Sequence, residues 1–432
     1  MRWQTVTAIL FMYGTIKEFR PATPFLTPFL VSEFKNFTKP EVYSQIYPYW
    51  TYSYLAALVP MFILTDILRY KPIIILEAAG LVFTWILLVF GERIWQMQLM
   101  QFAFGVSSAS EIAYYAYIYA VVDKKHYTKA TSYIRTATLV GKLFAFGFSQ
   151  LMISMQWGTY MTLNKITLIA VILSFLIVLF LPGLQFENPR IRPDVESLTN
   201  IGQESEFEPK ETESYLAEFL RRNFEELKIC SKNVNLITWS IWWILATCGM
   251  NQVQNYAQSL WSEMQFDSSN VANGGVEFIN SINGAILSFS FQYFDISWKK
   301  YAKSVLPIST IIVAILLQIS ARTTKILIVY ASYILVNAIY DLLKTAASSN
   351  VAEALSNTNS HGLVFGVNTF FAVSLQSLMT LLIVDNHFLS LDIRTQFIFY
   401  SFYYAIIGCL LFIFWCHSCF AENAENEDET CQ

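Results

Sequence analysis

A single carboxylate, Glu111, lies in the middle of a stretch of membrane-spanning length, residues 107–129. Tyr114, Tyr115 and Tyr119 follow it at spacings that place all three on its face of a helix. A carboxylate at membrane depth costs about 2.5–3.5 kcal/mol on insertion scales and usually faces an interior or a water-filled cavity. An acid surrounded by aromatic rings is suited to an organic cation. The stretch therefore predicts a cavity lined by this face.

A second charged group lies in the first apolar stretch, where Glu18 and Arg20 precede Pro21. Neither charge can face lipid cheaply, and proline interrupts the hydrogen-bond ladder of a helix. Broken helices with charges at membrane depth are typical of transporter gates and binding sites. Glu18 and Arg20 are therefore candidates for gate or coupling residues, and the alternative is a charge pair that holds helices together.

Aromatic and amide side chains supply further candidates. Tyr47 and Trp50 belong to a run of aromatic residues denser than an interfacial belt requires, so they are candidates for stacking inside the cavity. In the second half of the chain, Asn273 and Glu277 open one apolar stretch and Gln376 lies in another. Buried amides need hydrogen-bond partners, so bonding between helices is the alternative to substrate binding. Glu277 is also a candidate gate or coupling residue.

The composition places these residues in a polytopic membrane protein. The chain has 432 residues, of which 55% are hydrophobic and only 14% charged, against about 25% charged in soluble domains. The charges cluster and leave apolar segments of about 20 residues, the length that crosses a bilayer. The predicted fold class is an all-α membrane protein with twelve transmembrane helices, at residues 5–30, 48–69, 72–91, 95–122, 131–155, 161–183, 234–262, 272–294, 302–321, 326–349, 362–385 and 394–417.

The spans divide into two sets of six, separated by a polar segment. We expect an N-terminal six-helix half (1–186), a cytoplasmic central loop with an amphipathic helix (187–232), and a C-terminal six-helix half (233–418). An acidic cytoplasmic tail, expected to be disordered, follows at 419–432. Two six-helix halves around a midplane site are the 6+6 layout of the major facilitator superfamily.

Basic residues and one sequon predict the orientation. Short loops carrying Lys71, Lys129 and Lys299 fall on the side of the N-terminus, so both termini should be cytoplasmic by the positive-inside rule. The first outside loop then carries the N-glycosylation sequon of Asn36. We expect a multi-pass glycoprotein of the plasma membrane.

Several motifs do not occur in the sequence. It has no Walker phosphate-binding loop, no H-E-x-x-H and no G-x-S-x-G, so it predicts neither an ATP-driven pump nor an enzyme. Cys416 and Cys419 flank a single histidine, an incomplete zinc set, and lipidation or an inert cluster are the alternatives. No metal, cofactor or nucleic-acid partner is expected.

These residues resemble the reduced folate carrier and thiamine transporter family of vitamin carriers. The resemblance implies a major-facilitator fold and carriage of folates or thiamine by alternating access. Its motifs are Arg20-Pro with Pro24-Phe-Leu-Thr-Pro28, Trp50-Thr-Tyr-Ser-Tyr54, Glu111-Ile-Ala-Tyr-Tyr, Asn251-Gln-Val with Asn255-Tyr, and Phe365-Gly-Val-Asn-Thr-Phe370.

The resemblance implies a cationic substrate ahead of an anionic one. Folate-carrying members place an arginine at the position of Glu111 and a lysine at that of Gln376, whereas thiamine-type members have glutamate and glutamine there. An unpaired Glu111 at low dielectric would also repel a dianion by several kcal/mol. The resemblance assigns to a thiamine site Tyr47, Trp50, Glu111, Tyr114 and Asn273.

Two departures keep folate as the alternative. Thiamine carriers have an acid where this chain has Thr23 and a base near Asn337. The predicted function is transport of thiamine or a related organic cation, with folate as the alternative substrate and a non-transporting vitamin receptor or sensor as the alternative of another class. Proton or anion coupling is open, and Glu18, Glu111 and Glu277 are the candidate proton carriers.

Overall fold

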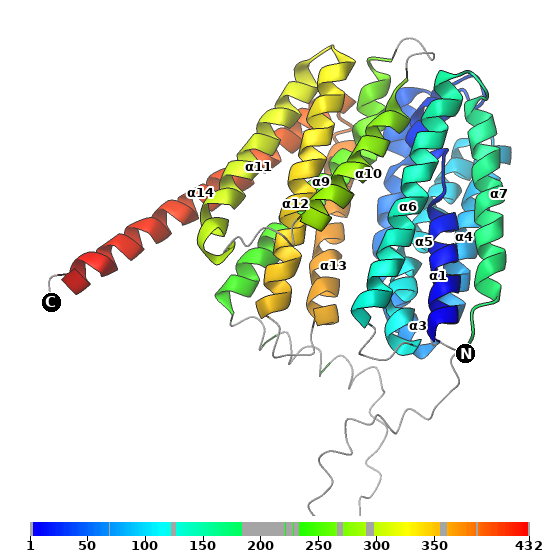
Figure 1. The fold of residues 1–432 in the computed structure, drawn as a ribbon. Helices are drawn as coiled ribbons and strands as arrows, with labels where there is room; N and C mark the ends of the chain where they lie inside the picture. The colour runs from blue at the N-terminus through cyan, green and yellow to red at the C-terminus, as the bar shows by residue number, and fades with distance from the viewer. Residues whose placement is uncertain are drawn as a thin grey trace, which may run out of the picture.

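The computed structural model describes residues 3–68, 70–121, 127–183, 221, 228, 233–265, 271–290, 298–354, 361–385 and 388–430. These residues form long helices joined by short turns, and Figure 1 shows them as a bundle with the N-terminus at one end. The amphipathic helix expected in the central loop lies outside the described residues.

The first half carries the first six predicted spans. Its elements are α1 (Trp3–Glu18), η1 (Thr23–Phe25), α2 (Leu26–Val31), η2 (Glu41–Ile46), α3 (Pro48–Ile67), α4 (Lys71–Phe90), α5 (Ile94–Val121), α6 (Tyr127–Ser154) and α7 (Tyr160–Leu179).

The second half repeats the pattern. It contains α9 (Val234–Ser262), α10 (Asn273–Ser290), α11 (Trp298–Arg322), α12 (Ile326–Ala354), α13 (His361–Met379), η7 (Thr380–Val384) and α14 (Ile393–Thr430). The twelve spans predicted from the sequence are confirmed, the first of them in two pieces. Among the described residues, seven helices are long and apolar enough to cross a membrane by themselves.

The first span is broken where the sequence places its charges. α1 ends at Glu18, and the helix resumes only at η1 and α2. Pro21 causes the break because it has no N–H to donate and disfavours helical geometry at the residue before it. The unwound stretch leaves Glu18 in the interior, where its side chain is 6% exposed.

Two contacts hold the first half tightly together. A Cβ on Gly105 of α5 would lie 2.7 Å from the backbone oxygen of Trp50, so only glycine allows α3 to approach this closely. Lys35 is buried in the loop after α2 and donates hydrogen bonds to the carbonyls of Val89 and Gly91. These bonds satisfy free carbonyl groups at the C-terminal end of α4.

The hydrogen bonds that join the halves gather on one side. The Gln258 amide accepts from the Thr27 N–H at 3.2 Å and donates to the Thr23 carbonyl at 3.0 Å. The Tyr52 hydroxyl donates to Asp385 at 2.9 Å. η1, α2 and the start of α3 carry the first-half partners, and α1 leads from the N-terminus towards them. The two halves therefore meet on the side opposite the N-terminus.

The C-terminal tail differs from the expectation of disorder. α14 runs through to Thr430, and Figure 1 shows its last part projecting away from the bundle. Extending an existing helix avoids the unfavourable nucleation step of a new one, and alanine and glutamate are good helix formers. The acidic tail is thus a continuation of the last span.

We expect Gly105→Ala to lower both stability and transport. The added methyl group must push α3 away from α5, at a cost of about 1–3 kcal/mol, and Trp50 moves with α3. Thermal unfolding of the detergent-purified protein should show a lower Tm. Gly366→Ala is the matched control, because a Cβ there meets nothing within 4 Å. An unchanged Tm for Gly105→Ala would contradict the close approach.

Candidate functional site

A cavity of about 180 Å³ lies between the two halves. Both halves contribute to its lining, which consists of aromatic, amide and small apolar side chains. The lining residues are Ala22, Thr23, Leu26, Tyr47, Trp50, Thr84, Trp85, Leu88, Met100, Gln101, Phe104 and Asn164 from the first half, and Gln254, Asn255 and Gln258 from the second.

One wall of the cavity is aromatic. Trp50 stacks on Tyr54 with ring centroids 5.6 Å apart, and its Nε1 donates to Ser108 Oγ at 3.2 Å. Phe104 lies 6.4 Å from Trp50 and 6.2 Å from Trp85, centroid to centroid. The rings come from α3, α4 and α5, so close packing of these helices fixes their positions. A planar ligand can stack against this wall.

Tyr47 closes one end of this wall. Its hydroxyl shares a hydrogen bond with Thr27 Oγ1 at 2.5 Å, and its ring lies 6.3 Å from that of Tyr256. Tyr47 is buried and its polar atom is already partnered. It therefore offers an apolar surface to the cavity and links α3 to α9.

The opposite wall is formed by amides of α9. Gln254 donates to Asn337 Oδ1 at 2.9 Å, and Asn255 approaches Thr51 Oγ1 at 3.5 Å. Three buried polar atoms of the lining have no hydrogen-bond partner in the described structure: Asn164 Oδ1, Trp85 Nε1 and Thr23 Oγ1. Leaving such groups unpaired is costly. A ligand with both donors and acceptors can supply the missing partners.

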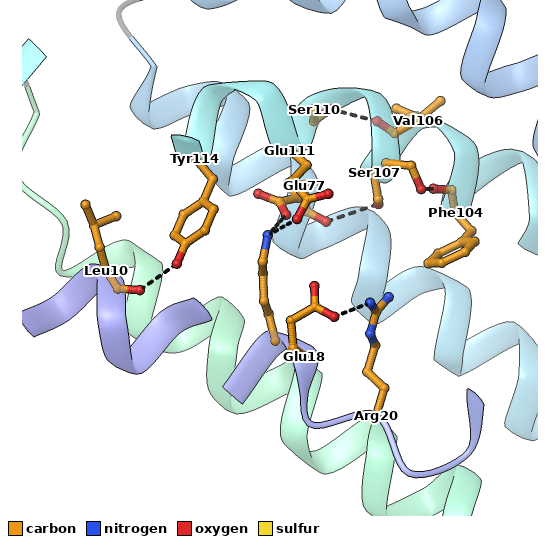
Figure 2. Close-up of polar contacts among 12 residues, drawn as sticks. Leu10, Glu18, Arg20, Glu77, Phe104, Val106, Ser107, Ser110, Glu111 and Tyr114 are labelled. Carbon is orange, nitrogen blue, oxygen red and sulfur yellow. Dashed lines mark hydrogen bonds and ion pairs between the residues drawn. The ribbon is translucent and has the colours of Figure 1, made fainter. Parts of the chain in front are cut away.

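A cluster of charges lies beside the aromatic wall. Lys17 Nζ, at the end of α1, lies 2.5 Å from Glu77 Oε1 of α4 and 2.9 Å from Glu111 Oε1 of α5. Figure 2 shows the two carboxylates next to each other. Lys17 and Glu77 are buried, whereas the Glu111 side chain is 34% exposed. The Lys17 ammonium also lies 4.2 Å from the centroid of the Tyr114 ring.

The broken stretch carries the rest of the cluster. Glu18 Oε2 lies 2.7 Å from the Arg20 guanidinium and 3.8 Å from Lys142 Nζ. The guanidinium lies 5.6 Å from the Phe104 ring and 5.9 Å from the Trp85 ring. Arg20 thus lies behind two rings that line the cavity. Glu18 and Arg20 pair with each other within the broken stretch, and only the contact from Glu18 to Lys142 of α6 is the predicted alternative, a charge pair between helices.

Lys17 and Glu77 were not among the site residues predicted from the sequence. Glu77 is the only charged residue within the predicted span 72–91, so the criterion that selected Glu111 would also have selected it. The pairing changes the electrostatic argument, because Glu111 is bound to an ammonium group. The argument from an unpaired Glu111 is therefore replaced by one from Lys17, Glu77 and Glu111 together, in which one ammonium group serves two carboxylates.

Tyr114 and Glu111 lie near the cavity without lining it. Tyr114 is fully buried, and its hydroxyl donates to the Leu10 carbonyl at 3.1 Å. Its ring packs edge-on against Tyr13 at 5.4 Å. Tyr114 therefore packs α5 against α1. The side chain of Tyr119 lies outside the described residues.

The candidates of the second half lie in hydrogen-bonded clusters outside the cavity lining. Asn273 Oδ1 accepts bonds from Gln265 at 2.7 Å and Tyr330 at 2.9 Å. Gln376 Oε1 accepts from Asn251 at 3.0 Å. Glu277 accepts from the Tyr333 hydroxyl at 3.0 Å. For Asn273 and Gln376, the described contacts are those of the alternative, bonding between helices.

Asn36 lies on an exposed turn between α2 and η2. Its φ is 56°, and its side-chain amide donates to the Glu33 carbonyl at 3.2 Å. Asparagine tolerates this left-handed conformation better than most residues. The sequon is accessible on the same side of the bundle as η1 and α2.

Comparison with known proteins identifies the family. The family model described as reduced folate carrier matches residues 1–399. The chain is 54% identical over 429 residues to folate transporter 1 of Caenorhabditis elegans, covering 98% of this chain and 94% of the relative. It is 38% identical over 442 residues to human thiamine transporter 1, covering 94% of this chain and 88% of the relative.

The fold also resembles solved transporter structures. The nucleoside transporter NupG superposes with a TM-score of 0.63 over 94% of this chain and 98% of that one, at 12% sequence identity. This likeness confirms the predicted major-facilitator fold. Since the family model and both relatives cover nearly the whole chain, this multi-pass membrane protein belongs to the reduced folate carrier family.

Proposed function

We propose that this protein carries a vitamin with a planar nitrogen heterocycle, thiamine or folate, across the plasma membrane. The observation that supports the proposal is the cavity between the halves, with an aromatic wall and unpartnered buried polar atoms. A heterocycle stacks on such a wall, and the nitrogens and amino groups at its edge pair with Asn164 and Trp85. Relatives named as folate and thiamine transporters support the same substrate class.

Alternating access is the proposed mechanism. The bonds that join the halves gather on the side opposite the N-terminus. If the N-terminus is cytoplasmic, as the basic loops predict, the carrier is closed towards the outside. Rocking of the halves would break these contacts and expose the cavity to the outside.

Different charged residues near the cavity support thiamine and folate as the substrate. Lys17 faces two carboxylates, so this part of the cluster keeps one negative charge when both are ionised, which favours the thiamine cation. Arg20 lies behind the aromatic wall and favours the carboxylates of folate. The relative at 54% identity, a folate transporter, adds to the case for folate. Both vitamins therefore belong in the decisive experiment.

Labelled thiamine and labelled folate should be compared in the same transport-deficient cells, at two pH values. We expect saturable accumulation of at least one vitamin above vector-only cells, inhibited by the same vitamin unlabelled. A change of rate between the pH values would support proton coupling. Binding without accumulation would favour the receptor alternative. The proposal would be refuted if the cells neither bound nor accumulated thiamine or folate.

Trp50→Ala should weaken substrate binding by tenfold or more. The substitution removes a stacking surface and the bond to Ser108, and an aromatic contact contributes about 0.5–1.5 kcal/mol beyond its burial. The apparent KM for the carried vitamin measures the loss. Trp157→Ala is the control, because the side chain of Trp157 is 74% exposed. Equal KM values for the two variants would remove Trp50 from the site.

Asn36→Gln should abolish N-glycosylation if the proposed orientation is right. The sequon lies on the side of η1 and α2, which the basic loops assign to the outside. Wild-type protein from mammalian cells should shift to lower mass on glycosidase treatment, and the variant should not respond. A variant that still shifts would place the glycan elsewhere, and a wild type that never shifts would argue against this orientation.

A further inference from the structure

Three ionisable residues form what we call the charge triad: Lys17, Glu77 and Glu111. One ammonium group serves two carboxylates, at 2.5 Å and 2.9 Å. The triad therefore has a net charge of −1 when all three groups are ionised, in contrast to a simple ion pair. The excess charge lies at membrane depth, where electrostatic interactions are poorly screened.

The two carboxylates are not equivalent. The Glu77 side chain is 3% exposed, and the Glu77 backbone carbonyl accepts a hydrogen bond from Ser107 at 3.1 Å, which ties α4 to α5 at this point. Glu111 is 34% exposed. Tyr13 and Tyr114 enclose the ammonium group on its other sides, at 5.5 Å and 4.2 Å from their ring centroids. Glu77 thus holds Lys17 in place, and Glu111 is the member that faces open space.

Glu111 continues the face of α5 that lines the cavity. Gln101 and Phe104 line it, Ser108 binds Trp50, and Glu111 follows at helical spacing. From Phe104 to Glu111 the helix rises by about 10 Å. The distance from Glu111 to a ligand in the cavity is therefore close to the Debye length of about 8 Å at physiological ionic strength. Because mostly protein lies between them, salt screens this interaction less than it would in water.

We propose that Lys17 and Glu77, which do not line the cavity, set the charge selectivity of the carrier. They act as positioning residues: Glu77 fixes the ammonium group of Lys17, and Lys17 offsets the negative charge of Glu111. This inference rests on the proposed function, because it concerns the choice between a cationic and an anionic vitamin. The selectivity is thus decided by residues outside the ring-binding cavity.

Two variants that differ only at Lys17 test the inference. Glu77→Gln gives a neutral Lys17–Glu111 pair, whereas Lys17→Met with Glu77→Gln leaves Glu111 alone with its negative charge. The double variant is used because Lys17→Met alone leaves Glu77 buried without a counter-ion, which is strongly destabilising. The measurement is the ratio of inhibition constants of thiamine and folate against uptake of the carried vitamin.

Relative to wild type, Glu77→Gln should shift this ratio at least about tenfold towards folate. The double variant should shift it at least about tenfold towards thiamine relative to Glu77→Gln. Tenfold corresponds to about 1.4 kcal/mol of differential binding. A purely structural role would lower the amount of carrier at the cell surface and the rate for both vitamins, without changing the ratio.

Lys35→Met is the matched control, because Lys35 is another buried lysine of the first half. Its substitution should lower stability and leave the ratio unchanged. Ratios within twofold of wild type in both triad variants, at normal surface expression, would overturn the inference.

If the double variant does not reach the cell surface, the ratio of Glu77→Gln relative to wild type is sufficient to test the inference. If wild type carries neither vitamin, the proposed function fails, and the ratio measured as binding to purified protein still tests the triad.

Discussion

The cost of placing charge at membrane depth is the constraint on which the first half of this protein depends. Six ionisable groups gather around the break in the first span: Lys17, Glu18, Arg20, Glu77, Glu111 and Lys142. Each lies within ion-pair distance of an opposite charge. The charge triad carries −1, and Glu18 with Arg20 and Lys142 carries +1, so the excess negative charge is confined to the triad. Breaking a buried ion pair is far more costly than breaking a surface one. The cluster therefore fixes how α1, α4, α5 and α6 sit against one another.

In the proposed function, the cost of burying charge also separates binding of the substrate ring from selection of the substrate charge. The cavity is lined by uncharged side chains, so the heterocycle of a substrate can stack and form hydrogen bonds without meeting a full charge. The charges lie behind this lining, with Arg20 beside the aromatic rings and Glu111 further along α5. The ring can thus be bound by one set of residues and the substrate charge selected by another.

The polar contacts between the halves have a different character from those within the first half. Among the described residues they are neutral or singly charged hydrogen bonds, such as Tyr52 to Asp385, and a partly exposed ion pair between Lys39 and Glu263 at 3.5 Å. Exposed pairs contribute about 0–1 kcal/mol each. Weak contacts of this kind suit the opening that the proposed alternating access requires, whereas the charge cluster holds the helices of the first half to one another.

The sequence by itself determined the fold class, the twelve spans, the break at Pro21 and the family. The length of apolar runs, the position of proline and the local motifs depend only on neighbouring residues in the chain. It also identified Tyr47 and Trp50, which line the cavity, and three members of the charge cluster, Glu18, Arg20 and Glu111. The sequence could not determine which charges pair: Lys17 and Glu77 are far apart in the chain, and their side chains meet only when the bundle brings the end of α1 within reach of α4. For the same reason, the lining residues Trp85, Asn164 and Gln258 were found only in the folded protein. Only the tertiary structure decided that Glu111 has a counter-ion, because ion pairs between helices depend on packing that no local pattern contains.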